Sequence, residues 1–185
     1  WSKIDGILFD QNYFWAINRW SDATFNTMRV LGGWQHGIEY RYVASNTTQG
    51  RINGRLFRDN LTGKTLWKAG ARHSQNLPNN FKFKGSLDLE SQQSLNRVVN
   101  NNIEERTRRN KDSYASVNKS WNNSSLDILA RFKESTSYTQ DDTLGVLPKI
   151  TYKVQQTRIE DTPFYFNLDT SSAWFVTDLK PQQDE

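Results

Sequence analysis

Few residues of this sequence could carry nucleophilic, acid–base or metal chemistry. The chain has no cysteine, and its two histidines are His36 and His73. Nucleophilic catalysis needs a hydroxyl or thiol beside a base that a third group orients, and a zinc site needs several ligands at regular spacing. The sequence contains no Gly-x-Ser-x-Gly segment and no such ligand pattern around either histidine. It therefore predicts no catalytic residue and no metal site, and His73 is interpreted as an ordinary strand residue.

Two adjacent acidic pairs, Glu104-Glu105 and Asp141-Asp142, are the other candidates for acid–base chemistry. Neighbouring side chains of an extended chain point to opposite sides, so neither pair readily forms the facing carboxylates of a glycosidase. No phosphate-binding loop or dinucleotide fingerprint is present either. The basic cluster at 106–111 directly follows Glu104 and Glu105, so we interpret it as a solvated loop rather than a nucleic-acid site. The sequence predicts a protein that is not an enzyme, has no cofactor and binds no nucleic acid.

The dominant pattern along the chain has a period of two residues. From Phe81 to Glu90, odd positions are apolar or glycine, and even positions are charged or hydroxylic. Successive side chains of a strand point to opposite faces, so this segment predicts a strand with one apolar and one polar face. The same alternation, strong or weak, recurs at 23–30, 38–44, 50–58, 65–74, 114–121, 126–133, 150–155 and 164–174.

Turn-forming residues separate these segments. Glycine, asparagine and proline mark turns at 32–33, 45–47, 60–63, 77–80 and 121–124, and two longer breaks cover 92–112 and 134–143. Residues 94–109 could hold a short helix or form a mobile loop. The pattern predicts an all-β fold, an antiparallel up-and-down meander of about nine or ten amphipathic strands, in one domain over 1–185.

Three features favour the wall of a transmembrane β-barrel over a soluble sheet. The strand at Phe81–Glu90 has the roughly 9–11 residues that a tilted membrane-spanning strand needs, whereas soluble strands average about 5–6. One face stays charged along its length, as a water-filled lumen permits. Aromatic residues, 13% of the chain, gather near strand ends, as at headgroup level in barrels. A soluble β-sandwich that binds glycans through exposed aromatics remains the alternative, and a generic porin-like barrel is another.

Cations on the polar sides of these strands are the candidate binding residues. They are Arg41, Arg55, Arg72, Lys82 and Lys84. In a barrel they would face the lumen and could guide anionic groups through charge-assisted hydrogen bonds. The plainer alternative is that they pair across strands with Glu39, Asp88 and Glu90 and only stabilise the wall.

The chain contains an ordered series of short motifs: YFWAIN at 13–18, DAT at 22–24, GIEYRY at 37–42, GRING at 50–54, IEERTRR at 103–109, DTL and LPKI at 142–150, and TPFYFNLDTSS at 162–172. This series resembles the barrel of the lipopolysaccharide-assembly outer-membrane family, the LptD or organic-solvent-tolerance proteins. The likeness covers Leu8 to Phe175.

The resemblance implies a wall segment of a non-enzymatic translocon that inserts lipopolysaccharide into the outer leaflet of the bacterial outer membrane. Its implied partners are lipopolysaccharide, a plug lipoprotein, periplasmic bridge proteins and the lipid bilayer. The family's N-terminal jellyroll, which meets the bridge, and its later barrel strands are absent here. We therefore expect a partial barrel domain, an internal fragment or processed product, whose sheet stays open within a larger barrel. Cysteines and early prolines of some members have no counterpart here, since the first proline is Pro78.

Overall fold

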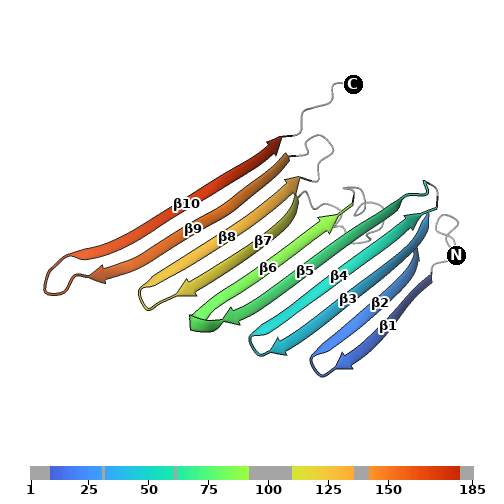
Figure 1. Cartoon of the computed structure of the whole chain (residues 1–185), viewed down its shortest axis with the longest axis horizontal. Coiled ribbons are helices and arrows are strands. Elements are labelled where there is room, and N and C mark those ends of the chain that lie inside the picture. Colours follow the sequence, from blue (N-terminus) through green and yellow to red (C-terminus); the bar gives the residue numbers. More distant parts are fainter. Residues whose placement is uncertain (1–8, 31, 61, 92–109, 136–141, 180–185) are drawn as a thin grey trace.

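The computed structural model describes residues 9–30, 32–60, 62–91, 110–135 and 142–179, and these form one antiparallel sheet. Its ten strands are β1 (Phe9–Asn18), β2 (Ser21–Val30), β3 (Gly33–Ser45), β4 (Thr48–Asp59), β5 (Thr65–Leu77), β6 (Phe81–Glu90), β7 (Asn110–Ser120), β8 (Ser124–Ser135), β9 (Asp142–Arg158) and β10 (Tyr165–Leu179). Each strand pairs with its neighbours in sequence, from β1 to β10 (Figure 1). The predicted up-and-down meander is confirmed.

The observed strands are as long as the predicted ones or longer. β6 has the predicted bounds, and the strands range from 10 residues in β1 to 17 in β9. The break predicted at 92–112 was wrong at its C-terminal end, because Asn110–Asp112 belong to β7. Ser135 and Asp142 likewise extend β8 and β9 into the other break. The segment 94–109, where a helix or a loop was considered, lies outside the described residues.

The connections define two ends of the sheet. At one, which we call the hairpin end, β1–β2, β3–β4, β5–β6, β7–β8 and β9–β10 are joined by two to six residues. The β5–β6 turn contains a 3₁₀ turn, Pro78–Asn80, in which Asn79 and Asn80 have φ of 60° and 62°. Asparagine tolerates this left-handed conformation better than most residues, which explains the turn predicted there. At the opposite end the connections span two to nineteen residues.

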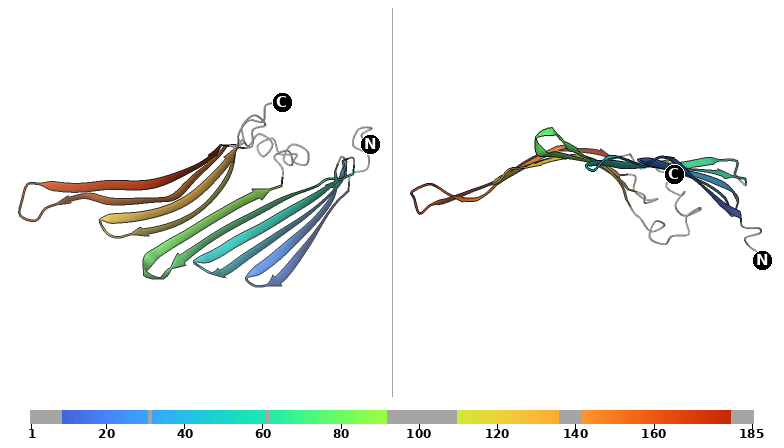
Figure 2. Two further views of the ribbon diagram at one scale, coloured as in Figure 1. Left: turned by 45° about the horizontal axis from the view of Figure 1, so that its top comes forward. Right: turned by 90° about the horizontal axis from the view of Figure 1, so that it is seen from below.

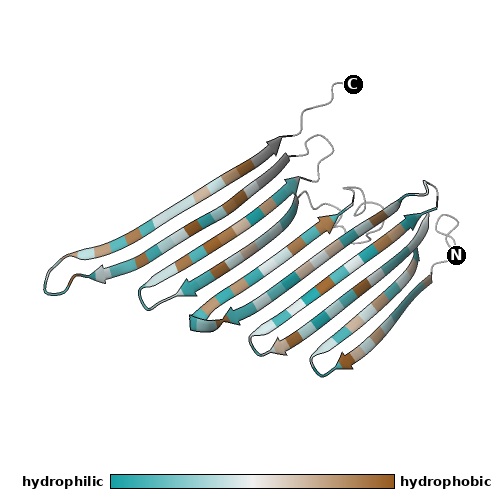
Figure 3. Ribbon diagram, in the orientation of Figure 1, coloured by the Kyte–Doolittle hydropathy of each residue, from teal (hydrophilic) through white to brown (hydrophobic). Residues whose placement is uncertain are grey.

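The strand register separates the side chains into two faces. Residues that are Cα partners on adjacent antiparallel strands lie on the same face, so the pairing can be followed across the sheet. The apolar face contains Ile38, Ile52 and Leu87, together with most of the aromatic residues. The charged face contains the alternate residues, among them Arg41 and Arg72. The alternation is visible along each ribbon when the strands are coloured by hydropathy (Figure 3).

The described residues form a single curved layer that does not close, and β1 and β10 lie at its two edges (Figure 2). The buried hydrophobic residues of this part of the chain are Ala23, Phe57 and Leu66. On the apolar face of β6, Leu87 and Leu89 are 45% and 43% exposed rather than packed in a core. A soluble sandwich would need a second layer over this face. The expectation of an open sheet, as opposed to a small closed barrel, is confirmed.

Exposed aromatic residues mark both ends of the sheet. Trp20, Trp121, Phe164 and Tyr165 lie at the hairpin end, and Phe9, Trp34 and Trp67 lie near the opposite end. Cations accompany them at both ends, since Lys119 lies over the rings of Phe81 and Trp121 and Arg29 lies over Trp34.

The pairing between β6 and β7 is shorter than elsewhere in the sheet. It joins Phe81–Ser86 to Tyr114–Lys119 and stops halfway along β6. Beyond it, the Asp88 backbone N–H donates to Ser113 Oγ at 3.0 Å, so a side chain replaces the backbone partner. This is a locally weakened contact between two otherwise continuous halves of the sheet.

Candidate functional site

The five predicted binding cations all lie on the charged face. Arg41 is on β3, Arg55 on β4, Arg72 on β5, and Lys82 and Lys84 on β6. Arg41 is the Cα partner of Arg51, and Arg51 is the Cα partner of Arg72. The strand register therefore makes neighbours of residues that are far apart in sequence. The predicted common face is confirmed, while the predicted binding role stays a prediction.

Three arginines occupy one cross-strand row, which we call the arginine row: Arg41, Arg51 and Arg72. Each is the Cα partner of the next on β3, β4 and β5. Directly opposed residues of an antiparallel pair lie about 4.5–5.5 Å apart at Cα, and like charges in such pairs are destabilising. A row of three guanidinium groups therefore needs counter-charges or an anionic ligand.

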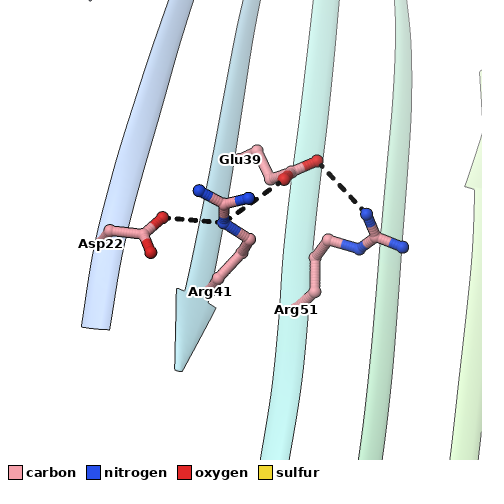
Figure 4. Close-up of polar contacts among 4 residues, drawn as sticks. All are labelled: Asp22, Glu39, Arg41 and Arg51. Atoms are coloured by element: carbon pink, nitrogen blue, oxygen red, sulfur yellow. Dashed lines mark hydrogen bonds and ion pairs between the residues drawn. The ribbon is translucent and has the colours of Figure 1, made fainter. Parts of the chain in front are cut away.

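Two carboxylates supply part of this compensation. Arg41 Nε donates to Asp22 Oδ1 at 2.8 Å and lies 3.7 Å from Glu39 Oε1. Arg51 Nη1 lies 3.7 Å from the other oxygen of Glu39, so that Glu39 bridges two arginines (Figure 4). These side chains are between 29% and 48% exposed, so solvent screens the pairs and each contributes little to stability. Among the described residues, Arg72 takes part in no ion pair, and it lies at the end of the arginine row farthest from Asp22.

A cavity of about 460 Å³ lies beside the arginine row toward the hairpin end. Its lining includes Arg41, Arg51, Arg72 and Lys84 together with polar and aromatic residues, and it includes no Asp or Glu. Guanidinium groups bind carboxylates and phosphates through paired N–H donors. The charge and the volume suit an anionic group such as a phosphate.

The cavities closer to the opposite end have a more balanced charge. One of about 260 Å³ is lined by Arg51, Arg55, Lys68 and Arg72, but also by the carboxylates Glu39 and Asp88. Another of about 390 Å³ contains Arg55 with Asp10 and Glu39. Of these three cavities, the one toward the hairpin end therefore has the most positive lining.

The alternative that the predicted cations pair across strands holds for Arg41, but with another partner than expected. Its cross-strand partner is Asp22 on β2, whereas Glu39, the expected partner, lies on the same strand as Arg41. Asp88, in contrast, pairs with Lys68 at 3.9 Å, and both side chains are only 13% exposed. Within the described part of the chain, no ion pair includes Lys82 or Lys84. Lys82 faces Asn76 and Asn118 in the register and does not line the 460 Å³ cavity.

Sequence reasoning missed Arg51, which holds the central position of the arginine row. The period-two pattern of 50–58 already places it on the same side of its strand as Arg55, so parity could have found it. The contacts of Arg51 with neighbouring strands depend on register, which the sequence pattern does not contain. Arg131 was missed in the same way, and it pairs with Asp112 at 3.2 Å and lies over the Tyr114 ring.

The residues considered for other chemistry form no site in the described ranges. His73 lies in β5, as predicted, with Nδ1 2.6 Å from the Tyr42 hydroxyl, and His36 Nδ1 lies 3.2 Å from Thr27 Oγ1. Both histidines are on the apolar face. No group of three or more metal-ligating side chains occurs among the residues that the structure describes.

The acidic pairs and the basic cluster are only partly described. Glu104, Glu105, Asp141 and residues 106–109 lie outside the described residues. The loop interpretation was wrong for Lys111, which lies in β7, is 6% exposed, and has Nζ 3.6 Å from Glu134 Oε2.

The profile of a family described as LptD protein matches residues 6–173. No curated protein matches the chain. In the described segments no helix is long and apolar enough to cross a membrane. The match spans most of the sequence, and the all-β meander is the architecture that the resemblance implied. LptD proteins are outer-membrane-associated components of lipopolysaccharide transport, and the chain belongs to this family.

Proposed function

We propose that this chain is a wall segment of an outer-membrane translocon that inserts lipopolysaccharide into the outer leaflet. The observation that carries the proposal is a single sheet of long strands with one charged and one aromatic-rich face, in a chain of the LptD family. In this arrangement the apolar face contacts hydrocarbon and the charged face lines an aqueous lumen. The chain contributes a surface and no covalent chemistry.

The two edges of the sheet make a larger barrel necessary under this proposal. β1 and β10 each have one side without a partner strand. Unpaired backbone N–H and C=O groups are too costly in hydrocarbon, so a membrane-spanning sheet must close. The chain is then part of a barrel domain whose other strands pair with β1 and β10. The family's N-terminal jellyroll would join this barrel to the periplasmic bridge proteins, and a plug lipoprotein would occupy the lumen.

The basic cavity gives the lumen wall a specific role. Lipopolysaccharide carries phosphates and acidic sugars, and the cavity at the arginine row offers four cations without a carboxylate. Arg41, Arg72 and Lys84 of the predicted set contribute directly, and Arg51 adds the fourth charge. Arg55 and Lys82 lie farther along the same face and extend the positive surface in both directions. The proposed role is guidance of the polar head of the substrate.

Site-specific photocrosslinking at adjacent residues on opposite faces tests the proposal. A photoreactive residue at Ser86 would lie on the charged face beside Arg72, and one at Leu87 would lie on the apolar face. In the complete translocon during transport, we expect lipopolysaccharide adducts at position 86 that depend on an energised substrate supply. Position 87 should give adducts with bulk lipid that do not depend on transport. Equal adducts at both positions, or a chain that stays monomeric and folded in buffer without detergent, would contradict the proposal.

A further inference from the structure

Lys119 is a cation of the apolar face that takes part in no ion pair with the described residues. Lys119 is on β7, one residue from the hairpin end of the strand. Its partners in the register are Phe81 on β6 and Leu126 on β8, both apolar. Its Nζ lies 4.4 Å from the centroid of the Phe81 ring and 4.7 Å from that of Trp121.

The surroundings of Lys119 hold its ammonium group in place without neutralising it. None of the ion pairs of the described residues includes Lys119. The neighbouring acidic residue Asp127 is on the charged face, where it accepts a hydrogen bond from Asn118 at 3.0 Å. Aromatic ring faces attract a cation but carry no net charge. A full positive charge therefore remains on a face that contacts lipid under the proposed function.

The position along the strand determines which lipid groups Lys119 can reach. A charge in hydrocarbon is costly, so a lysine near the end of a strand extends its long side chain toward the headgroups. The exposed Trp121, at 45% exposure, marks the same level, because Trp favours the membrane–water interface. At this level the abundant anion is the lipid phosphate.

The adjoining hairpin turns provide space and hydrogen-bond donors. A cavity of about 580 Å³ lies between the β5–β6 and β7–β8 turns, and Lys119 and Trp121 are in its lining. Four asparagines from the two turns complete most of the wall: Asn79, Asn80, Asn122 and Asn123. Their amide groups can donate hydrogen bonds to phosphate oxygens while the ammonium supplies the charge.

The connection lengths assign the hairpin end to the periplasmic side. Bacterial barrels have short periplasmic turns and longer extracellular loops. The hairpin end has connections of two to six residues, whereas the opposite end has one that spans residues 91–109. We propose that Lys119, held between Phe81 and Trp121, binds the phosphate of an anionic phospholipid in the periplasmic leaflet. This inference rests on the proposed function, since it requires the apolar face to be in a membrane.

The test measures lipid retention by the intact barrel that contains this chain. The protein is reconstituted in nanodiscs that mix phosphatidylglycerol with phosphatidylcholine, and the lipids that remain bound are counted by native mass spectrometry. Replacement of Lys119 by glutamine should lower the preference for phosphatidylglycerol about fivefold, the effect expected for one basic residue at a membrane surface. Lys119→Arg should keep the preference. Lys149→Gln, which removes an equal charge from the charged face of β9, should also leave it unchanged.

Separate outcomes distinguish the ways in which the inference can fail. Unchanged retention in a folded Lys119→Gln barrel would overturn it, as would a loss as large in Lys149→Gln. Displacement of the retained lipid by excess inorganic phosphate would show a free-anion site in place of a lipid site. Failure of the wild-type protein to enter nanodiscs would overturn the proposed function itself, whereas wild-type insertion without lipid preference would overturn only the Lys119 site.

Discussion

The two faces of the sheet can be distinguished by placing the same charge on either side of one strand. Ile128 and Leu129 are adjacent residues of β8, similar in size and both half-buried. Ile128 lies on the apolar face between Val117 and Ile150, and Leu129 lies on the charged face between Ser116 and Lys149. We predict that Ile128→Arg destabilises the barrel much more than Leu129→Arg.

The expected size of the difference follows from the position of Ile128 along the strand. β8 has 12 residues, so at about 3.4 Å per residue and a tilt of about 45° it rises about 26 Å. Ile128 is the fifth residue and so lies about 4 Å from the middle of that rise. An arginine facing lipid near the midplane costs about 2–4 kcal/mol, which lowers the folding equilibrium constant roughly 30- to 700-fold. Leu129→Arg adds only a like-charge contact with Lys149, at most about 1 kcal/mol.

Urea unfolding of the complete barrel in lipid vesicles, followed by tryptophan fluorescence, measures both free energies. The expected result is a difference of about 1–4 kcal/mol between the two variants. Equal losses would mean that both faces meet the same medium. A larger loss for Leu129→Arg would place the charged face inward against an apolar environment. Either outcome would refute the assignment of lipid and lumen faces.

Three further substitutions test local features, with the same unfolding assay unless stated. Gly33→Ala should cost about 1–3 kcal/mol, because its Cβ would collide with the backbone carbonyl of Arg58, whereas Gly37→Ala, whose nearest contact is 3.6 Å, should be tolerated. Phe57→Ala should cost about 3–5 kcal/mol because Phe57 is only 1% exposed, and a loss below about 1 kcal/mol would contradict a packed site. Ser113→Ala should speed hydrogen exchange at the β6 backbone amide that its hydroxyl binds, and unchanged exchange there would mean that water replaces the hydroxyl without cost.

The fold was predictable because each strand carries its own local signal. Alternation over Phe81–Glu90 gave the bounds of β6 without reference to any other strand. The β5–β6 turn was predictable for the same reason, since Pro78 and the two asparagines that follow have strong conformational preferences of their own. Where the local signal is weak, as at Asn110–Asp112, the strand forms because β8 provides a partner, and the prediction failed.

The candidate site was predictable only in part, because it depends on how strands align. Parity placed Arg41, Arg72 and Lys84 on the charged face, but their common cavity results from the register between β3, β4, β5 and β6. Turns and packing determine this register, so it could not be predicted from the alternation within each strand. Phe57 is another residue whose position alternation did not predict. It is a buried aromatic on the charged face, where alternation alone predicts a polar residue.

Under the proposed function, the charge of the lumen-facing side changes along the path of the substrate. Near the opposite end, cations share their cavities with Asp10, Glu39 or Asp88, whereas the lining of the cavity toward the hairpin end contains cations and no carboxylate. Short connections assign the hairpin end to the periplasm. A phosphorylated substrate that arrives from the periplasm would therefore meet the most positive surface first. Beyond it, carboxylates already compensate the cations, so binding becomes weaker along the path. This gradient would concentrate the substrate at the entry, and because passage to weaker binding sites is energetically uphill, net movement toward the outer leaflet must be driven by the continued arrival of substrate.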